Sequence, residues 1–485
     1  MPDDDFHMNK LILSRLNIAA LVLSFLLIAS SVSAQTDAVD DYIKAEMQKR
    51  RIPGLALAVV KEGKVVKAKG YGVANLEHDI PVTPQTVFAI ASLDKQLTAT
   101  AVMMLVEEGK IGLDDHIARY FETPPDTWKN IKVRHLLTHT AGLQDDFVER
   151  VNGRIFERYT NKQLFENAKK LPVDFLPGEK FQYSDQGFFL LQLIVEKASG
   201  LPYRKFLSER ICKPLEMTAT YYLDQHEIIK NRATAYELDP DGRFRPERWR
   251  LIEFDLYNDV GSTVLDFARW DAALYTEKLL KKPSLDQMWM PAKLNNGSTV
   301  CFNSLFRSNY SYGFAWVLGD FRGHRIIMHT GFTGTCIFRL PDDKTTVIVF
   351  TNLTGPSGSG PEGLALGVAG MYVPEVFWLA MKEKPDPDPQ ITRKLKDELL
   401  RFAKGQPDSS LYTSAFHLIV RAGAPAFQSH LKRLGVLESL TFLDEESREG
   451  KRLLYYRAGY ENGRLFLRIT LNKEGLIERL QGDRV

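Results

Sequence analysis

The spacing of apolar positions marks two strands and two buried helices within residues 55–200. The stretch LALAVVKEGKVVKAKGYG predicts a strand, a tight turn at Glu62–Gly63 and a second strand. The stretch LTATAVMMLVEEG is apolar on nearly all sides, so the helix predicted from about Ser92 to Glu108 is buried in a core. FFLLQLIVEKASG, Phe188–Gly200, predicts a second apolar helix that ends at its glycine.

Strand-like runs return after residue 310. The runs YGFAWVLGDF, HRIIMHTGFTGTCIFRLP and TTVIVFTN alternate with turn residues and predict an antiparallel meander. A helix is predicted to follow over about Glu362–Lys382. Residues 225–260 are polar and rich in Asp, Arg and Pro, and we interpret them as an inserted lobe.

A polar, proline-interrupted segment, KEKPDPDPQ at 382–390, is typical of a stiff linker between domains. Beyond it, Ile391–Lys404 and Ser409–Ala422 predict helices, and the runs VLESLTFL, RLLYYRA, RLFLRITL and LIERLQ predict strands. The chain is therefore expected to contain a principal domain over 35–381 and a small α+β domain over 391–485.

Composition agrees with this organisation and excludes some partners. A chain of 485 residues exceeds one ordinary hydrophobic core, and its 26% charged residues are ordinary for a globular protein. The formal net charge is only +2 and no basic run is present, so we expect no nucleic acid partner. Three cysteines without repeated spacing predict neither a disulfide framework nor a metal site, and a Cys301–Cys336 bridge stays open.

Residues 1–34 have the pattern of a cleavable signal peptide. Cationic residues precede an apolar run over Ile18–Ile28, and a V-x-A cleavage motif ends at Ala34. The acidic stretch before Met8 fits no signal, so Met8 is the expected start. A permanent membrane anchor is the alternative, although the apolar run is short for a membrane span. We expect a secreted or periplasmic protein without a membrane span after cleavage.

The stretch ASLDKQLTA, residues 91–99, contains an S-x-x-K pattern at Ser92 and Lys95. Ser92 suits a helix N-cap, because a serine hydroxyl accepts a hydrogen bond from a free backbone N–H group. Lys95 is unexpected there, because a cation in the first turn meets the positive end of the helix dipole. Positions i and i+3 share a helix face, so a reactive pair is the second interpretation. The pattern alone is weak, since Ser429 and Lys432 repeat it.

Three further stretches carry reactive residue types, each with a plainer alternative. HLLTHTAGL places His135 and His139 four apart, as on zinc-binding helices, but a leucine occupies the position of a metalloprotease glutamate. We therefore favour a buried helix and turn there. PGEKFQYSDQG places Tyr183 on a loop where packing is the alternative, and residues 159–161 form a rival Y-x-N match. HTGFTGT, His329–Thr335, has glycines within a strand pattern, which indicates a bulge or a close approach of the backbone.

In this order the four stretches resemble the serine β-lactamase and penicillin-binding protein superfamily, and within it the branch of class C β-lactamases, DD-peptidases and carboxylesterases. The resemblance covers roughly Ala38–Ala380 and includes IPGLALAVV and GSTVLDFARW. It implies a β-lactamase/transpeptidase-like α/β (α+β) fold, in which an antiparallel sheet is flanked by helices and joined by an all-helical lobe. It implies no metal and no cofactor, and it does not predict an oligomeric state.

By this resemblance, Ser92 matches the acyl-accepting nucleophile, Lys95 its partner and Tyr183 the proton-shuttling tyrosine. The backbone N–H groups of Ser92 and Phe332 are then expected to form the oxyanion hole. Substrate contacts are implied for Asp185, His329 and Gly331.

The expected chemistry depends on burial and on two departures from the family pattern. A dry pocket near a helix N-terminus lowers a lysine pKa by up to ~3–5 units, so Lys95 is expected to supply a neutral amine as general base. Asp185 replaces the usual asparagine of Y-x-N, and His329 replaces a common lysine as a pH-dependent attraction for a substrate carboxylate. Both favour a general esterase or amidase acting on small acyl substrates, and neither excludes a peptidase acting on D-amino-acid peptides. A carboxylesterase or D-amino-acid peptidase acting on a small acyl or peptide substrate is therefore expected. The alternatives are a β-lactamase and a penicillin-binding or sensing module without turnover.

Overall fold

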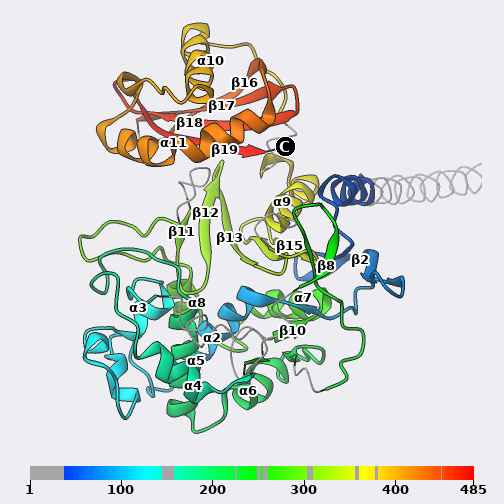
Figure 1. Ribbon diagram of the computed structural model, residues 1–485, viewed down its shortest axis with the longest axis vertical. Coiled ribbons are helices and arrows are strands. Elements are labelled where there is room, and N and C mark those ends of the chain that lie inside the picture. Colours follow the sequence, from blue (N-terminus) through cyan, green and yellow to red (C-terminus); the bar gives the residue numbers. More distant parts are fainter. Residues whose placement is uncertain are drawn as a thin grey trace, which may run out of the picture.

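An antiparallel sheet of eight strands runs through the larger of two folded units in the computed structural model (Figure 1). Within the described part of the chain, no helix is both long and apolar enough to cross a membrane. The signal peptide predicted at 1–34 lies outside the described residues, which are 38–144, 158–223, 227–247, 253–254, 260–302, 310–355, 360–376, 381–448 and 450–484.

The strand order of this sheet is β11-β12-β13-β14-β15-β1-β2-β3. The predicted first hairpin is observed, and its turn residues Glu62 and Gly63 have φ of 51° and 76°, as a tight hairpin turn requires. The predicted meander is also observed, with its second run divided into two strands. The bounds are β1 (Gly54–Lys61), β2 (Lys64–Asn75), β3 (Ile80–Pro81), β11 (Ser311–Tyr312), β12 (Val317–Phe321), β13 (His324–Gly331), β14 (Thr335–Leu340) and β15 (Thr345–Thr351).

Alternate residues of the central strands point into two separate cores, because successive side chains of a strand face opposite sides. The odd-numbered residues 55–59 of β1 pack against the helix at 38–50 and against α9 (Pro361–Tyr372). The even-numbered residues 56–60 pack against helices of the other face. α9 ends earlier than predicted because Pro374 follows Val373, and proline cannot continue a helix.

The second face of the sheet carries the helical lobe, which contains the two predicted apolar helices. α2 is buried on nearly all sides, as predicted, and α5 ends at Gly200 with a φ of 74°. The helices are α2 (Asp94–Glu107), α3 (Val133–Leu137), α4 (Asn161–Ala168), α5 (Asp185–Ser199), α6 (Tyr203–Phe206), α7 (Val264–Ala273) and α8 (Lys282–Met288), with a short 3₁₀ turn, η1 (Ala91–Leu93), before α2.

Short strands form three smaller sheets. The inserted segment 225–260 is described only in part, and its described residues contribute to each of these sheets. The strands are β4 (Phe88–Ala89), β10 (Val260–Ser262) and β6 (Tyr221–Tyr222); β5 (Arg158–Tyr159) and β9 (Glu253–Phe254); and β7 (Tyr236–Leu238) and β8 (Phe244–Pro246). The β7–β8 pair packs against the core on the α9 side of the large sheet.

The smaller unit has a hydrophobic core of its own between one face of a four-stranded sheet and two helices. All four predicted strands and both helices are present, and the second helix extends further than predicted. The bounds are α10 (Pro389–Ala403), α11 (Ser414–Leu434), β16 (Leu437–Arg448), β17 (Lys451–Tyr460), β18 (Gly463–Leu471) and β19 (Ile477–Arg484).

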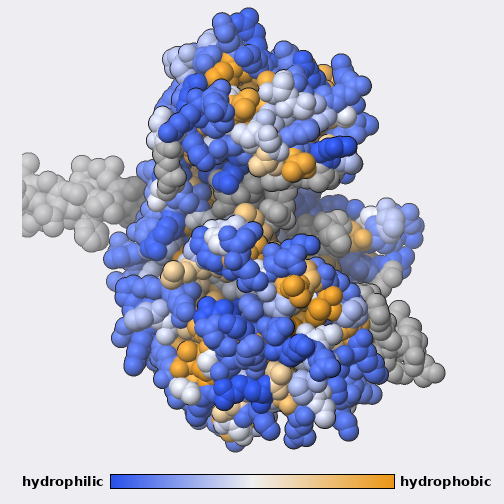
Figure 2. All heavy atoms as spheres, turned by 90° about the vertical axis from the view of Figure 1, so that its left-hand side faces the viewer, coloured by the Kyte–Doolittle hydropathy of each residue, from blue (hydrophilic) through white to orange (hydrophobic). Residues whose placement is uncertain are grey.

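The other face of that sheet packs on the tip of the β12–β13 hairpin, which reaches up to it in Figure 1. Phe321 contacts the rings of Tyr455 and Phe466. Arg322, in the hairpin turn, forms ion pairs with Asp444 at 2.9 Å and Glu446 at 3.1 Å. In Figure 2 the surface of both units is mainly hydrophilic, with apolar side chains in separate patches.

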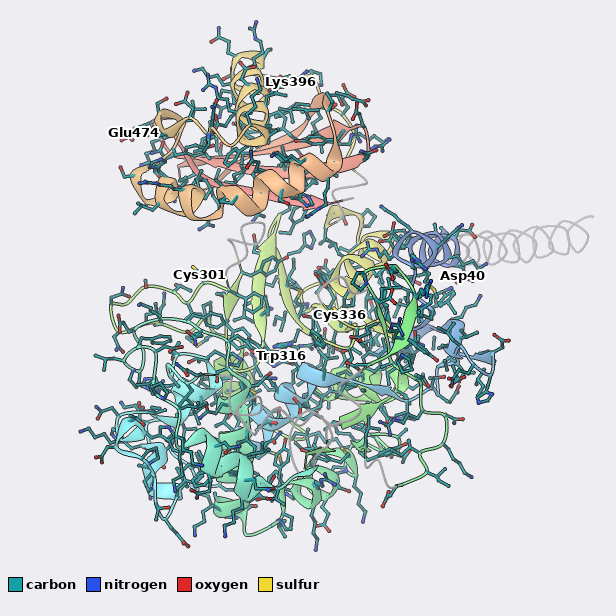
Figure 3. All side chains as sticks on the ribbon, viewed as in Figure 1. Asp40, Cys301, Trp316, Cys336, Lys396 and Glu474 are labelled. Carbon is teal, nitrogen blue, oxygen red and sulfur yellow. The ribbon has the colours of Figure 1, made fainter. Side chains whose placement is uncertain are left out.

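The possible disulfide is not formed. Cys301 is exposed, whereas Cys212 and Cys336 are buried, the latter in β14. Figure 3 shows Cys301 on the outer side of the sheet and Cys336 near its centre.

Candidate active site

Ser92 and Lys95 lie at the junction between η1 and α2. The Lys95 Nζ donates a hydrogen bond of 3.0 Å to Ser92 Oγ, and the Lys95 side chain is only 1% exposed. α2 begins at Asp94 without a side-chain cap, so the N-cap interpretation of Ser92 is wrong. The preceding Ala91 has a φ of 46°, a left-handed conformation that costs a non-glycine residue on the order of 1 kcal/mol. This strained turn presents Ser92 beside Lys95.

Asp185 is the first residue of α5, where the Ser184 side chain caps the helix by accepting from the Gly187 N–H. Its Oδ1 lies 2.6 Å from Lys95 Nζ, and its side chain is 25% exposed. Burial alone lowers the pKa of Lys95, but the interactions with Asp185, Tyr183 and Asp94 together outweigh it and raise that pKa above the usual value. This direction is opposite to the lowered pKa expected for a neutral Lys95 amine, and it favours the ammonium form.

Asp94 is a third ionisable group of this buried cluster. Burial raises its pKa to about 7; the charge of Lys95 opposes this rise and that of Asp185 adds to it. The folded chain thus binds more protons here than the unfolded chain, where the carboxyl titrates near 3.8. Stability from this group is fully present below about pH 4 and is lost as the pH rises through about 7.

Asp94→Asn removes that titration. We expect the difference in urea midpoint, variant minus unchanged protein, to be larger at pH 8 than at pH 4.5, because asparagine carries no charge to bury. Urea unfolding curves at both pH values test this. If the midpoint difference between the two proteins is the same at pH 4.5 and pH 8, the prediction is contradicted.

Tyr183 lies on the loop before α5, with its ring 5.2 Å from Lys95 Nζ. Burial raises its pKa to about 12, although hydrogen bonds with Ser92 and Lys95 act in the opposite direction. Tyr183 is therefore a neutral hydroxyl at physiological pH, within hydrogen-bonding reach of both residues. The site brings together Ser92, Lys95, Tyr183 and Asp185 from two segments that are distant in sequence.

We call the HTGFTGT stretch, His329–Thr335, the third motif, and it lies at the end of β13 against the turn that carries Ser92. A Cβ atom on Gly331 would lie 2.3 Å from the Ile90 carbonyl oxygen, so only glycine permits this approach. The hydroxyls of Thr333 and Thr335 donate to the carbonyls of Ala89 and Ile90, at 2.6 and 2.9 Å. These contacts hold the strand end beside η1.

Phe332 and His329 of that motif differ in how far they are exposed to solvent. Phe332 is 51% exposed at the end of β13. His329 is buried, and burial, with the nearby charge of Lys95, lowers its pKa to about 4. This direction favours the uncharged imidazole at neutral pH and argues against the expected attraction of a substrate carboxylate by charge.

The rival motifs do not join this cluster. Ser429 and Lys432 are exposed on α11 of the smaller unit. His135 accepts from the Lys132 backbone N–H, whereas His139 lies beneath Tyr183, so the two histidines have different partners.

Sequence reasoning missed two residues of the site. His139 stood in a stretch that was interpreted as packing, and only its spacing marked it. Tyr312, fully buried on β11, bonds to His329 Nε2 at 3.0 Å and carries no sequence signal.

Comparison with known proteins agrees with this fold. The Beta-lactamase family model matches residues 39–369, and the chain belongs to this family; it is a serine hydrolase. The penicillin-binding protein 4* of Bacillus subtilis (strain 168) is 29% identical over 329 residues, which are 63% of this chain and 69% of that protein. The protein flp of Staphylococcus aureus (strain MRSA252) is 31% identical over 41% of each chain.

Solved structures share the fold. The octameric penicillin-binding protein homologue from Pyrococcus abyssi has a TM-score of 0.62 at 24% identity, with 90% of each chain covered. EstCE1, described as a hydrolase with promiscuous acyltransferase activity, has a TM-score of 0.59 at 20% identity over 70% of this chain and 99% of its own. The D-amino acid amidase from Ochrobactrum anthropi SV3 has a TM-score of 0.57 at 23% identity, over 70% and 99%.

Proposed function

We propose that the protein cleaves an ester or amide bond of a small acyl or peptide substrate through an acyl-enzyme on Ser92. The observation that carries this proposal is the hydrogen bond from Lys95 Nζ to Ser92 Oγ, with the Tyr183 hydroxyl beside both. A carboxylesterase or D-amino-acid peptidase is the favoured activity, supported by the described activities of EstCE1 and the D-amino acid amidase. The backbone N–H groups of Ser92 and Phe332 are proposed to bind the oxyanion.

Lys95 acts in this mechanism as an ammonium. As Ser92 Oγ bonds to the substrate carbonyl carbon, its proton passes to Tyr183 Oη, and Tyr183 gives its own proton to the leaving group. Lys95 stabilises the negative charge that develops on Ser92 Oγ. The carboxylate of Asp185 favours the ammonium form of Lys95. Water then hydrolyses the acyl-enzyme by the reverse proton path.

Asp185→Asn is expected to introduce a loss of activity at high pH. Without the carboxylate, burial lowers the pKa of Lys95, so the ammonium is lost as the pH rises. A fall of about 2.5 units in that pKa from the ordinary value of 10.5, within the ~3–5 units that burial can produce, leaves about one tenth of the amine protonated at pH 9. Such a fall reduces kcat/KM at pH 9 relative to pH 6 by about tenfold. Initial rates with p-nitrophenyl butyrate measure this.

The matched control is Asp114→Asn, which changes a carboxylate paired with Arg134 on the surface and leaves the profile unchanged. If Asp185→Asn instead gains activity as the pH rises, neutral Lys95 is the base and the ammonium mechanism is wrong. A change in KM alone, with an unaltered profile, would assign Asp185 to substrate binding only.

We further propose that residues 1–34 are removed on export, so that the protein works in the periplasm or outside the cell. The hydrolase domain then spans 35–381, the linker 382–390 and the accessory domain 391–485. N-terminal sequencing of the exported protein tests the cleavage after Ala34, and a retained apolar segment would contradict it.

One experiment separates the activities. The chain from Gln35 onward is incubated with p-nitrophenyl butyrate, with a D-alanyl peptide and with a fluorescent penicillin, and acyl adducts are located by mass spectrometry. Turnover with a transient adduct on Ser92 is expected for the ester or the peptide. Fast penicillin hydrolysis would identify a β-lactamase, and a stable penicillin adduct without other turnover would identify a penicillin-binding sensor.

A further inference from the structure

His139 contacts the Tyr183 ring and the backbone on both sides of Tyr183. Its carbonyl oxygen accepts from the Gln182 N–H at 2.9 Å, and its Nδ1 accepts from the Ser184 N–H at 3.0 Å. The two amides that flank Tyr183 are thus both held by one residue. The imidazole also stacks on the Tyr183 ring, with centroids 4.1 Å apart and planes 29° apart.

The backbone of His139 is strained to make these contacts. Its φ of 55° is left-handed, where a non-glycine residue costs ~1–3 kcal/mol. The residue is also almost fully buried, and Phe181, Phe188 and Tyr312 surround its ring. The surrounding contacts therefore fix both its backbone and its ring.

From His139 a line of hydrogen bonds continues to the third motif. His139 Nε2 lies 3.1 Å from Tyr312 Oη, and Tyr312 Oη lies 3.0 Å from His329 Nε2. His329 Nδ1 lies 2.8 Å from the Thr330 carbonyl oxygen. The line joins the segment after α3, in the helical lobe, to β11 and β13 of the sheet.

Both ends of this line determine where its protons lie. The Ser184 N–H can only donate, so His139 Nδ1 accepts and its Nε2 carries the hydrogen. The Thr330 carbonyl can only accept, so His329 Nδ1 carries the hydrogen and its Nε2 accepts. The single Tyr312 hydroxyl proton then points to His329, and every group in the line has a partner.

We propose that His139 and Tyr312 are positioning residues that hold Tyr183 and the end of β13 in one fixed arrangement through two neutral histidines. The proposal rests on the proposed function of Tyr183. Protonation of either histidine would place a hydrogen against an existing donor. Burial and the nearby charge of Lys95 favour the neutral rings, and Asp185, the carboxylate of this cluster, acts in the opposite direction.

The first test is independent of activity. In ¹⁵N-histidine-labelled protein, NMR is expected to show His139 as the Nε2–H tautomer and His329 as the Nδ1–H tautomer, without titration from pH 6 to 8. The His139→Gln and His329→Gln variants assign the signals. The opposite tautomer at either residue, or protonation in this range, overturns the inference while the chemistry of Ser92 stands.

The second test is kinetic. Tyr312→Phe removes only the central hydroxyl, and we expect kcat to fall about tenfold or more with KM within threefold, because misplacement of catalytic groups acts on the transition state. The His329 pKa should rise in the same variant, visible by NMR. His139→Asn keeps an acceptor for Ser184 and tolerates positive φ, so it should retain about tenfold more activity than His139→Ala.

His135→Gln, in the same stretch but without contact to this line, is the matched control and should leave kcat unchanged. A Tyr312→Phe variant with normal kcat and an unmoved His329 pKa contradicts the positioning role. Inactivity of the unchanged protein towards every acyl substrate refutes the proposed function instead, and the tautomers still decide the inference.

Discussion

Ser92→Ala is expected to lower kcat/KM for the preferred ester or peptide by a factor on the order of 10⁴ or more, since loss of a nucleophile removes the whole covalent route. The fold should persist, because Ser92 does not cap α2 and only loses a hydrogen bond from Lys95. No acyl adduct should form on the variant. Initial rates and intact mass spectra measure both effects.

The chain provides a matched control for this substitution. Ser429 stands in the second S-x-x-K pattern but is exposed on α11, so Ser429→Ala should behave as the unchanged protein. Ester turnover by Ser92→Ala at a normal rate would place the chemistry elsewhere. Equal losses in both variants would indicate a general effect on folding.

Asp271→Ala is expected to destabilise the larger unit by about 3–5 kcal/mol, because it leaves a buried guanidinium without its counter-charge. Arg339 Nε donates to Asp271 Oδ1 at 2.7 Å, and both side chains are at most 1% exposed. The Thr346 hydroxyl donates to the same oxygen at 2.9 Å. The rings of Trp289 and Trp316, the latter labelled in Figure 3, lie 5.0 and 5.8 Å from the guanidinium carbon.

Tryptophan fluorescence during urea unfolding reports this loss, since all six tryptophans precede residue 381. Asp286→Ala breaks an exposed helical pair with Lys282, and it should cost under about 1 kcal/mol. The double variant Asp271→Leu with Arg339→Met should recover most of the stability, because it removes both charges. A single variant as stable as the Asp286 control would refute the importance of the buried pair.

The local sequence predicted most elements of this protein. The strands of the meander, the buried α2 and the four strands of the smaller unit follow from side-chain periodicity, which depends only on neighbouring residues. Helix ends were less accurate: α9 stops before Pro374, and Ser92 lies in η1 rather than at the start of α2. Hydrogen bonds of the final turn depend on what packs against it.

The structure brings Ser92, Lys95 and Tyr183 into one cluster, as the resemblance of the motifs implied, and their catalytic roles stay predictions. Their electrostatics were not predictable in the same way. The sequence shows Asp185 as a departure from an asparagine, but only the fold shows that its carboxylate lies 2.6 Å from Lys95 Nζ and acts with Tyr183 and Asp94 to raise the Lys95 pKa.

The sequence by itself therefore determined which elements form, in which order, and which residues belong to the family pattern. The tertiary structure alone decided that Asp185 contacts Lys95, that His329 is buried and that Tyr312 joins His139 to the HTGFTGT stretch. The physical reason is distance: charge and hydrogen-bond interactions act through space over a few ångströms. They therefore depend on which distant segments the fold brings together, and no local pattern records that.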